Sequence, residues 1–544
     1  MTNRHWQASY GKVPHEINAD AYPSVTAMMD EAMKKFAERP AFRCAGQTLS
    51  YADMDRLSRD FAAYLQSKLG VKKGDRIAVM TPNLLAFPIA FLGIIRAGAA
   101  QVNVNPLYTP RELEHQLNDA GVQTIVVFSG VSGTVAEVKA KTGLKTVITN
   151  GVGDGSGKAL PSPPVDARLA GAVSFAEALA EGAKLPFTPV ASSGDDLLFL
   201  QYTGGTTGLS KGAALSHRNL VANAEQYKAF MPAELLVPGQ SIVTAIPLYH
   251  IFALMVNYIT FFTLGADNWL VPNPRDFDAF IDTMKAAKPN VFMGVNTLYA
   301  GLVAHPRSKE VDWSHLKLSG GGGAAVIRAV SDKWKAMTGR IIHEGYGLSE
   351  TSPVLSFNPL WMSEFTATTG LPMPSTDIKL IDDNGKEVAL GESGEIVAKG
   401  PQVMKGYWNK PEANAAAFTP DGYFKTGDVG VFDARGLLKI VDRKKDMIIV
   451  SGFNVYPNEI EDVVTGCPGV AECACIGVPD EKSGEAVKVF VVKAPNATLS
   501  ADDVLAHCRK QLTGYKMPRH VSFIESLPKS TVGKILRREL RDVK

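Results

Sequence analysis

Between residues 76 and 128, short apolar segments alternate with longer helical segments, and this order limits the folds that the chain can adopt. The strand-like segments are Arg76–Met80, Ala100–Val104 and Val122–Phe128, and the first helical segment is Leu84–Ala97. The second helix has clear ends, because Thr109 suits the N-cap, Pro110 the first helical position and Gly121 the position just past the end. A strand–helix–strand–helix–strand order is typical of parallel sheets covered by helices. We therefore expect an α/β protein built from layered subdomains.

The length of 544 residues is enough for more than one domain. Residues 150–164 and 186–195 are low-complexity segments and are expected to be loops. Over residues 371–440 the pattern changes, because short β-like runs alternate with Gly and Asp turns. These runs are Asp377–Ile381, Gly394–Ala398 and Leu437–Val441. We expect a β-rich subdomain in this region.

The compact charged run DRKKD, residues 442–446, precedes a segment of about 100 residues that has the size of a small domain. Val487–Lys493 alternates as a strand, and Ser500 with Asp503 forms a capping box at the start of a helix. We expect a large N-terminal domain over residues 1–442 and a small α+β C-terminal domain over residues 443–544.

The composition is ordinary for a soluble globular protein, with 45% hydrophobic and 21% charged residues. A net charge of +2 gives no bulk attraction to nucleic acid or to an anionic membrane. Leu84–Ile95 and Ile251–Leu264 are apolar but shorter than the roughly 20 residues that span a bilayer, so we expect buried core helices. No apolar signal core stands at the N-terminus, and the odd number of cysteines, five, indicates reduced thiols in a cytosolic protein.

Residues 202–212, YTGGTTGLSKG, form a loop rich in glycine and threonine. An apolar run, Leu197–Leu200, precedes it and a helix-like stretch begins at about His217, so we expect a strand, a flexible loop and a helix. Bare glycine backbone lets amides approach an anionic oxygen, hydroxyls donate to it, and Lys211 adds a positive charge. The spacing is not that of a Walker A motif, in which Gly-Lys is followed by Ser or Thr. The loop indicates a polyphosphate site, with a plain surface loop as the alternative.

Four further stretches offer groups that could contact a nucleotide. They are GGGGA at 320–324, GYGLSET at 345–351, YFKTGD at 423–428 and PKSTVGK at 528–534. The first leaves bare backbone for a flat ring, and the second offers Tyr346 as an aromatic face and Glu350 as a hard carboxylate ligand. Asp428 suits two ribose hydroxyls, and Lys534 follows a glycine turn. Singly, each stretch has a structural alternative as a loop, core residue, turn or surface lysine; together they supply the contacts that Mg-ATP needs.

The chain resembles the adenylate-forming superfamily of acyl-CoA synthetases, luciferases and non-ribosomal adenylation domains. The resemblance covers essentially the whole chain and rests on YTGGTTGLSKG, PLYH (247–250), GYGLSET, YFKTGD, DRKKD, SGFNVYPNEIE (451–461) and PKSTVGK. The sequence between the motifs, such as PLYHIFAL, NPRDFD and GVNTL, is most similar to that of bacterial long-chain fatty acyl-CoA synthetases.

The resemblance implies an enzyme with two half-reactions and ATP, Mg²⁺ and coenzyme A as cofactors. A fatty acid carboxylate attacks the α-phosphate of ATP, giving acyl-AMP and pyrophosphate, and the thiol of CoA then displaces AMP. Because one anion attacks another in the first step, positive charge at the phosphates is the chief catalytic need.

The resemblance also assigns the catalytic groups. Lys534 would bridge the acyl carboxylate and the α-phosphate, and Lys211 and Ser349 would contact the phosphates. Ser349 stands where the family usually has threonine, and its hydroxyl preserves the contact. Thr203 and Glu350 would bind Mg²⁺, a hard cation that prefers oxygen ligands.

The remaining nucleotide contacts follow from the same motifs. Tyr346 would stack on adenine, against the backbone of residues 321–324, and Asp428 and Arg443 would hold the ribose. The other implied contacts are Gly204, Gly205, Thr206, Thr207, Gly208, Gly322, Gly323, Ala324, Gly345 and Gly347.

A mobile C-terminal domain is implied as well. It would rotate about Lys445, two residues after the ribose-binding Arg443, and so remove Lys534 and bring the segment around Gly452 toward CoA. His250 is an implied substrate residue, and Leu254 stands where some relatives have a tryptophan gate. Phe252, Val295 and Thr297 are candidate substrate residues of the acyl pocket by neighbourhood only, with plain core as the alternative.

Three other functions stay open at this point. They are a ligase for medium-chain, aromatic or amino acids, a fatty acyl-AMP ligase that transfers to a carrier protein, and a non-catalytic lipid-binding protein. Retention of Lys534, Glu350 and Asp428 argues against the last. The cysteines and the net charge predict a cytoplasmic protein with no nucleic acid partner. From the resemblance alone we expect a homodimer and peripheral contact with the inner face of the membrane.

Overall fold

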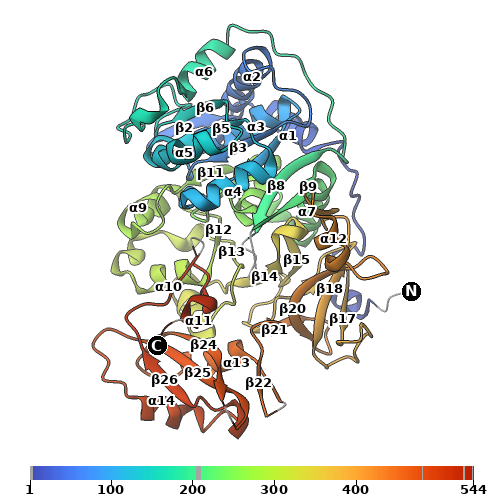
Figure 1. The fold of residues 1–544 in the computed structure, drawn as a ribbon, viewed down its shortest axis with the longest axis vertical. Coiled ribbons are helices and arrows are strands. Elements are labelled where there is room, and N and C mark those ends of the chain that lie inside the picture. Colours follow the sequence, from blue (N-terminus) through green and yellow to red (C-terminus); the bar gives the residue numbers. More distant parts are fainter. Residues whose placement is uncertain are drawn as a thin grey trace.

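The computed structural model describes residues 4–203, 210–451, 453–480, 482–530, 533–541 and 543. Its described strands form four sheets. Figure 1 shows the C-terminal elements, in orange and red, below a larger N-terminal part.

The first large sheet contains the segments that the alternation predicted. Its order is β19-β9-β8-β4-β3-β5-β6-β7, and all neighbouring pairs from β8 to β7 are parallel. The strands are β3 (Arg76–Met80), β4 (Ala100–Asn103), β5 (Thr124–Phe128), β6 (Thr146–Asn150), β7 (Val173–Ser174), β8 (Leu197–Thr203), β9 (Lys211–Ser216) and β19 (Gly406–Tyr407). The predicted parallel α/β arrangement is therefore confirmed.

The helices of this part follow the predicted signals closely. Helix α3 spans Ala86–Arg96, and α4 (Pro110–Ala120) has the capping box of Thr109 with Glu112 and ends at Gly121, whose φ is +63°. The other N-terminal helices are α1 (Val25–Lys35), α2 (Tyr51–Ser67), α5 (Ser132–Val138), α6 (Phe175–Gly182), α7 (His217–Phe230), α8 (Phe261–Thr263), α9 (Phe277–Ala287), α10 (Asn296–Ala304) and α11 (Arg328–Thr338).

A second large sheet has the order β16-β15-β14-β13-β12-β10-β11-β1-β2. Its strands are β1 (Pro40–Cys44), β2 (Gln47–Ser50), β10 (Ser241–Thr244), β11 (Asp267–Leu270), β12 (Val291–Gly294), β13 (Leu318–Gly321), β14 (His343–Gly347), β15 (Val354–Phe357) and β16 (Leu371–Pro372). β12, β13 and β14 are parallel neighbours, so their carboxyl ends, with the glycine run and Tyr346, share one edge.

One local prediction was wrong. We expected a strand, the glycine–threonine loop and a helix from about His217. Helix α7 does begin at His217, but an unpredicted strand, β9, lies between the loop and the helix and pairs antiparallel with β8. The loop therefore closes a β-hairpin. The β9 sequence, KGAALS, is poor in the β-branched and aromatic residues that mark strands, and pairing with β8 overrides that weak preference.

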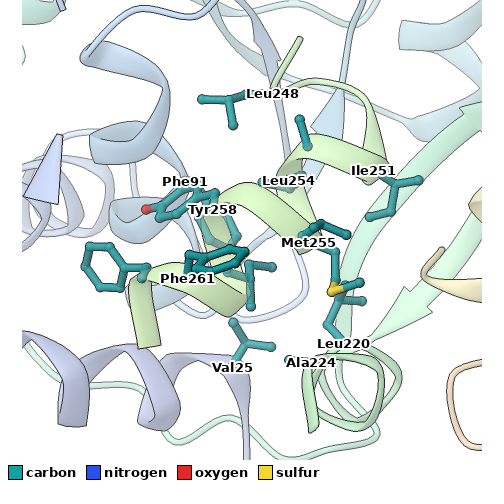
Figure 2. Close-up of a cluster of buried hydrophobic side chains, with 14 of the residues drawn as sticks. Val25, Phe91, Leu220, Ala224, Leu248, Ile251, Leu254, Met255, Tyr258 and Phe261 are labelled. Carbon is teal, nitrogen blue, oxygen red and sulfur yellow. The ribbon is translucent and has the colours of Figure 1, made fainter. Parts of the chain in front are cut away.

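The apolar segment 251–264 lies in the core, as predicted. Residues Ala253–Thr260 form a π-helix, all of whose side chains are buried, and Figure 2 shows Leu254, Met255 and Tyr258 among side chains from α3 and α7. Its polar residue Asn257 donates to Thr244 Oγ1 at 3.0 Å, so the buried amide nitrogen is satisfied. No helix in the described parts of the chain is long and apolar enough to cross a membrane.

The predicted β-rich subdomain is an antiparallel sheet of order β17-β18-β20-β21. Its strands are β17 (Asp377–Ile381), β18 (Gly394–Lys399), β20 (Phe424–Phe432) and β21 (Leu438–Arg443), and α12 (Pro411–Ala417) lies beside β19 and β20. The alternative of a turn at Gly427-Asp428 is wrong, because both residues lie inside β20.

The C-terminal sheet begins at Ile448, five residues after β21 ends at Arg443. It contains β22 (Ile448–Val450), β23 (Phe453–Val455), β24 (Val470–Asp480), β25 (Gly484–Lys493) and β26 (His520–Phe523). Its helices are α13 (Pro457–Thr465), α14 (Ala501–Cys508), with the predicted Ser500 capping box, and α15 (Arg537–Leu540). The five cysteines are free and buried: Cys44, Cys467, Cys473, Cys475 and Cys508.

Candidate functional site

The base of the glycine–threonine loop is fixed by the β8–β9 hairpin. Thr203 and Lys211 are the last paired residues, so both stand at the loop's mouth. His115 on α4 contacts the carbonyl oxygen of Ser210 through Nε2 at 2.8 Å and holds one end of the loop. The predicted contacts Gly204, Gly205, Thr206, Thr207 and Gly208 lie outside the described residues.

Glu350 is brought to the same place by a short 3₁₀ helix, Ser349–Thr351, which packs against β8 and β9. Tyr407, on the edge strand β19, donates its hydroxyl to Glu350 Oε1 at 2.8 Å, and Lys211 Nζ lies 4.8 Å from the centre of the Tyr407 ring. Burial raises the pKa of Glu350. Thr203, Lys211, Ser349 and Glu350, which the sequence predicted as phosphate and metal contacts, therefore gather around one hairpin.

This donor set fits Mg²⁺ bound together with a nucleotide. The described residues hold no cluster of three or more His, Cys, Asp or Glu side chains that could cage a metal alone. Mg²⁺ is commonly held by one or two carboxylates, waters and the substrate's phosphates, and Glu350 beside the β8–β9 hairpin supplies such a carboxylate.

The nucleoside contacts predicted from three distant motifs also converge. Tyr346 on β14 donates its hydroxyl to Asp428 Oδ2 at 2.7 Å, and Asp428 stands opposite Arg443 in the β20–β21 pair, with Arg443 Nε 3.6 Å from Oδ1. Burial is the main cause that raises the pKa of Tyr346, and the Asp428 charge adds to it. The tyrosine thus stays a neutral donor that orients the Asp428 carboxylate.

Bare backbone lies next to this group. Gly322 has the carbonyl oxygen of Gly345 and the ring of Phe252 near its side-chain position, where a Cβ would lie 3.3 and 3.4 Å from them. Gly323 has a φ of +78°, which favours glycine, and it is followed by Ala324. Gly345 and Gly347 flank Tyr346, and a Cβ on Gly347 would lie 1.8 Å from the carbonyl oxygen of Pro353. The packing at Gly347 requires glycine.

Lys534 reaches this site from the C-terminal domain. A turn holds it, because Ser530 N–H donates to the Lys534 carbonyl at 2.7 Å, Lys534 N–H donates to Ser530 Oγ at 3.1 Å, and Gly533 has a φ of +77°. The turn packs against α10, since a Cβ placed on Gly533 would lie 2.4 Å from Thr297 Oγ1.

The pKa values of Lys534 and His250 reflect the position of Lys534 next to the candidate nucleotide site. Burial, and then the Arg443 charge, lower the pKa of Lys534 to about 8, while Asp428 opposes the shift. Burial and the Lys534 charge lower the pKa of His250 to about 4, so that imidazole is neutral at pH 7. Lys534 therefore interacts electrostatically with the predicted ribose residues, Asp428 and Arg443, and with the predicted substrate residue His250.

Among the candidate acyl-pocket residues, Phe252 and Val295 lie near the glycine run, whereas Leu254 lies in the core. His250 is partly buried, and its Nδ1 accepts from Phe252 N–H at 3.3 Å. Val295 precedes α10 and lies near Gly323. Leu254 is fully buried in the π-helical core (Figure 2), so Phe252, rather than Leu254, faces the glycine run.

The predicted hinge residue Lys445 lies in a turn between β21 and β22, where Asp446 N–H and Met447 N–H both donate to the Arg443 carbonyl. Gly452 lies outside the described residues. Tyr407 and His115 could not be predicted from the sequence, because their contacts are with residues 57 and 95 positions away.

Two family models match the chain, and curated relatives match it over nearly its whole length. The AMP-binding enzyme family matches residues 29–408, and the AMP-binding enzyme C-terminal domain matches residues 459–534. A long-chain-fatty-acid–CoA ligase of Salmonella typhimurium is 49% identical, covering 97% of this chain and 96% of the relative. A feruloyl-CoA synthase of Amycolatopsis is 36% identical, covering 92% and 95%.

Solved structures share the fold. The structure of ATP-bound MatB from Rhodopseudomonas palustris matches with a TM-score of 0.84 at 33% identity, covering 95% of this chain and 98% of that one. The anthranilate CoA ligase AuaEII with anthranoyl-AMP matches with a TM-score of 0.87 at 25% identity, covering 96% and 98%. With a family match over most of its length and near full-length relatives, this chain belongs to the AMP-binding enzyme family.

Proposed function

We propose that this protein is a long-chain fatty acid–CoA ligase that forms AMP. The fatty acid carboxylate attacks the α-phosphate of ATP and releases pyrophosphate, and CoA thiol then attacks the acyl-AMP carbonyl and releases AMP. The observation that carries the proposal is the partly buried Lys534 ammonium, which lies within electrostatic reach of Asp428, Arg443 and His250.

Each group has a role that its position supports. Lys534 attracts both the incoming carboxylate and the α-phosphate, and so offsets the repulsion between two anions. Asp428, oriented by Tyr346, accepts from the ribose hydroxyls beside Arg443. Lys211 contacts the β- and γ-phosphates from the mouth of the glycine–threonine loop, and the adenine ring lies between Tyr346 and the glycine run.

Mg²⁺, held by Glu350 and Thr203, would neutralise charge on the phosphates. Tyr407 keeps the Glu350 carboxylate in place through its hydroxyl. In the second half-reaction, rotation about Lys445 would withdraw Lys534 and bring the segment around Gly452 to the pantetheine thiol.

A substrate panel tests the proposed activity. The purified protein is given ATP, Mg²⁺ and CoA with butyrate, octanoate, palmitate, oleate, benzoate or ferulate, and the thioester and AMP are quantified. We expect the highest kcat/KM with palmitate or oleate. A preference for ferulate would favour an aromatic carboxylate–CoA ligase, which the 36% identity to a feruloyl-CoA synthase makes the second candidate. Acyl-AMP that accumulates without thioester would indicate an acyl-AMP ligase.

The lowered pKa of Lys534 predicts a pH dependence. The ammonium is the active form, so kcat/KM for adenylate formation should fall as the pH rises through about 8, well below the ordinary lysine value of 10.5. The measurement is ATP–pyrophosphate exchange with palmitate as a function of pH. In Lys534→Arg the residual activity should not fall near pH 8, because the guanidinium stays charged. An unchanged fall in that variant would assign the titration to another group.

A further inference from the structure

Asp442 is a fully buried carboxylate at the junction of the two domains. It is the second-last residue of β21 and pairs with Val429 in the β-rich sheet, so its backbone belongs to the N-terminal domain. Its side chain has no solvent exposure. None of the roles proposed above uses it.

The Asp442 carboxylate caps a helix of the other domain. Its Oδ2 accepts from the backbone N–H of Asn458 at 2.8 Å, and Asn458 is the second residue of α13. The residue at the N-cap, Tyr456, provides no side-chain hydrogen bond to the helix. A carboxylate at this place satisfies a free helical N–H and lies at the positive end of the helix dipole.

The same carboxylate holds Arg537, three residues after Lys534. Arg537 Nη1 donates to Asp442 Oδ1 at 3.1 Å, and Nε and Nη2 donate to the two oxygens of Glu461 at 2.9 and 2.8 Å. Nη2 also donates to the side-chain oxygen of Asn458. The segment that carries Lys534 is thereby tied both to α13 and to the N-terminal domain.

The residues that make these contacts lie on both sides of the predicted hinge, Lys445, in the sequence. Asp442 precedes it, whereas Asn458, Glu461 and Arg537 follow it. Rotation about Lys445 leaves the Arg537–Glu461 pair intact but separates Asp442 from Asn458 and Arg537. By contrast, Lys444 binds Asp383 and Glu395, and all three precede the hinge.

We propose that Asp442 is a positioning residue for adenylate formation: it holds the C-terminal domain in the orientation that brings Lys534 to the nucleotide site. The inference rests on the role proposed above for Lys534. A buried carboxylate that loses its partners is left uncompensated, so the contacts of Asp442 favour this orientation over any in which they are broken. The carboxylate binds the domain it orients but touches no reacting group.

Asp442→Asn tests the proposal with little change in shape. The amide keeps one acceptor but turns an NH₂ group toward either Asn458 N–H or the Arg537 guanidinium, both of which are donors. The matched control is Asp383→Asn, which removes a carboxylate from Lys444 without touching a contact that crosses the hinge. A second variant, Arg537→Lys, keeps the charge but loses the planar fork that joins Asp442 to Glu461.

Domain orientation is measured directly by fluorescence energy transfer. Lys309→Cys and Lys510→Cys place labels on exposed positions of the two domains, and the native cysteines are buried. Single-turnover formation of palmitoyl-AMP and thiolysis of supplied palmitoyl-AMP are measured on the same variants without labels, and thermal unfolding verifies that each is folded.

In Asp442→Asn we expect the distance distribution to broaden or shift, adenylate formation to slow by about tenfold and thiolysis to be retained. Arg537→Lys should change both readouts in the same direction and by less, and it carries the test if Asp442→Asn does not fold. Asp383→Asn should match the unsubstituted protein. An unchanged distance distribution in a folded Asp442 or Arg537 variant overturns the proposal, whatever its activity. If the unsubstituted protein forms no acyl-AMP, the proposed function fails, whereas the distance measurement still decides the orientation.

Discussion

Lys534→Ala is expected to slow acyl-adenylate formation by about 10³-fold, whereas the rate of thiolysis of supplied acyl-AMP should stay nearly unchanged. The carboxylate and the α-phosphate are both anionic, and the Lys534 ammonium lies in a partly buried site, where its charge is less screened than in water. The second half-reaction releases AMP from a mixed anhydride by attack of a thiol on the acyl carbonyl, and it does not bring a carboxylate against an anionic phosphate. Lys534 should therefore matter in one step only.

Two assays separate these steps for the Lys534 variant. ATP–pyrophosphate exchange with palmitate reports on the first, and thioester formation from synthetic palmitoyl-AMP and CoA reports on the second. Lys529→Ala is a matched control, because Lys529 lies five residues earlier in the same segment but pairs with Glu472 inside the C-terminal domain. Equal losses in both half-reactions for Lys534→Ala would show that this lysine supports folding or domain docking rather than charge neutralisation.

The fold could be predicted wherever local sequence and tertiary structure agree. The alternation over residues 76–128 predicted parallel strands, and Thr109 and Ser500 marked helix starts, because caps and apolar periodicity act within a few residues. β9 was missed, since glycine and alanine make its own preference weak and its pairing with β8 supplies the stability. The π-helical form of Ala253–Thr260 has no local signal of its own, and it depends on packing from all sides (Figure 2).

The candidate site shows the same division. Tyr346, Asp428 and Arg443 were recognisable because each sits in a motif, and the structure brings them into contact. Tyr407, Asp442 and Arg537 act by holding other residues, and their partners lie far along the chain: Asp442 and Arg537 are 95 residues apart. Such pairings depend on how the domains pack, and no spacing in the sequence encodes them.

Gly533→Ala is expected to slow adenylate formation by about 10²-fold, because a small displacement of a catalytic group has a large effect on rate. Gly533 has a φ of +77°, a conformation in which alanine is strained by about 1–2 kcal/mol. The added methyl would also lie 2.4 Å from Thr297 Oγ1, so the turn must move away from α10. Lys534 is the next residue and must move with it. Pyrophosphate exchange measures the loss, and thiolysis of supplied palmitoyl-AMP should change far less.

The two causes of this loss can be separated by a second substitution on α10. Thr297→Ala removes the atom that the new methyl would meet, so the double variant Gly533→Ala, Thr297→Ala should regain most of the rate if the clash displaces Lys534, and little of it if backbone strain does. Gly514→Ala is the control in the same domain, since a methyl there meets no atom within 4 Å and its φ is not positive. A Gly533→Ala variant with full exchange activity would mean that the turn does not dock against α10 when ATP and the fatty acid react. The proposal that Lys534 acts from this docked turn would then be wrong, even if Lys534→Ala is inactive.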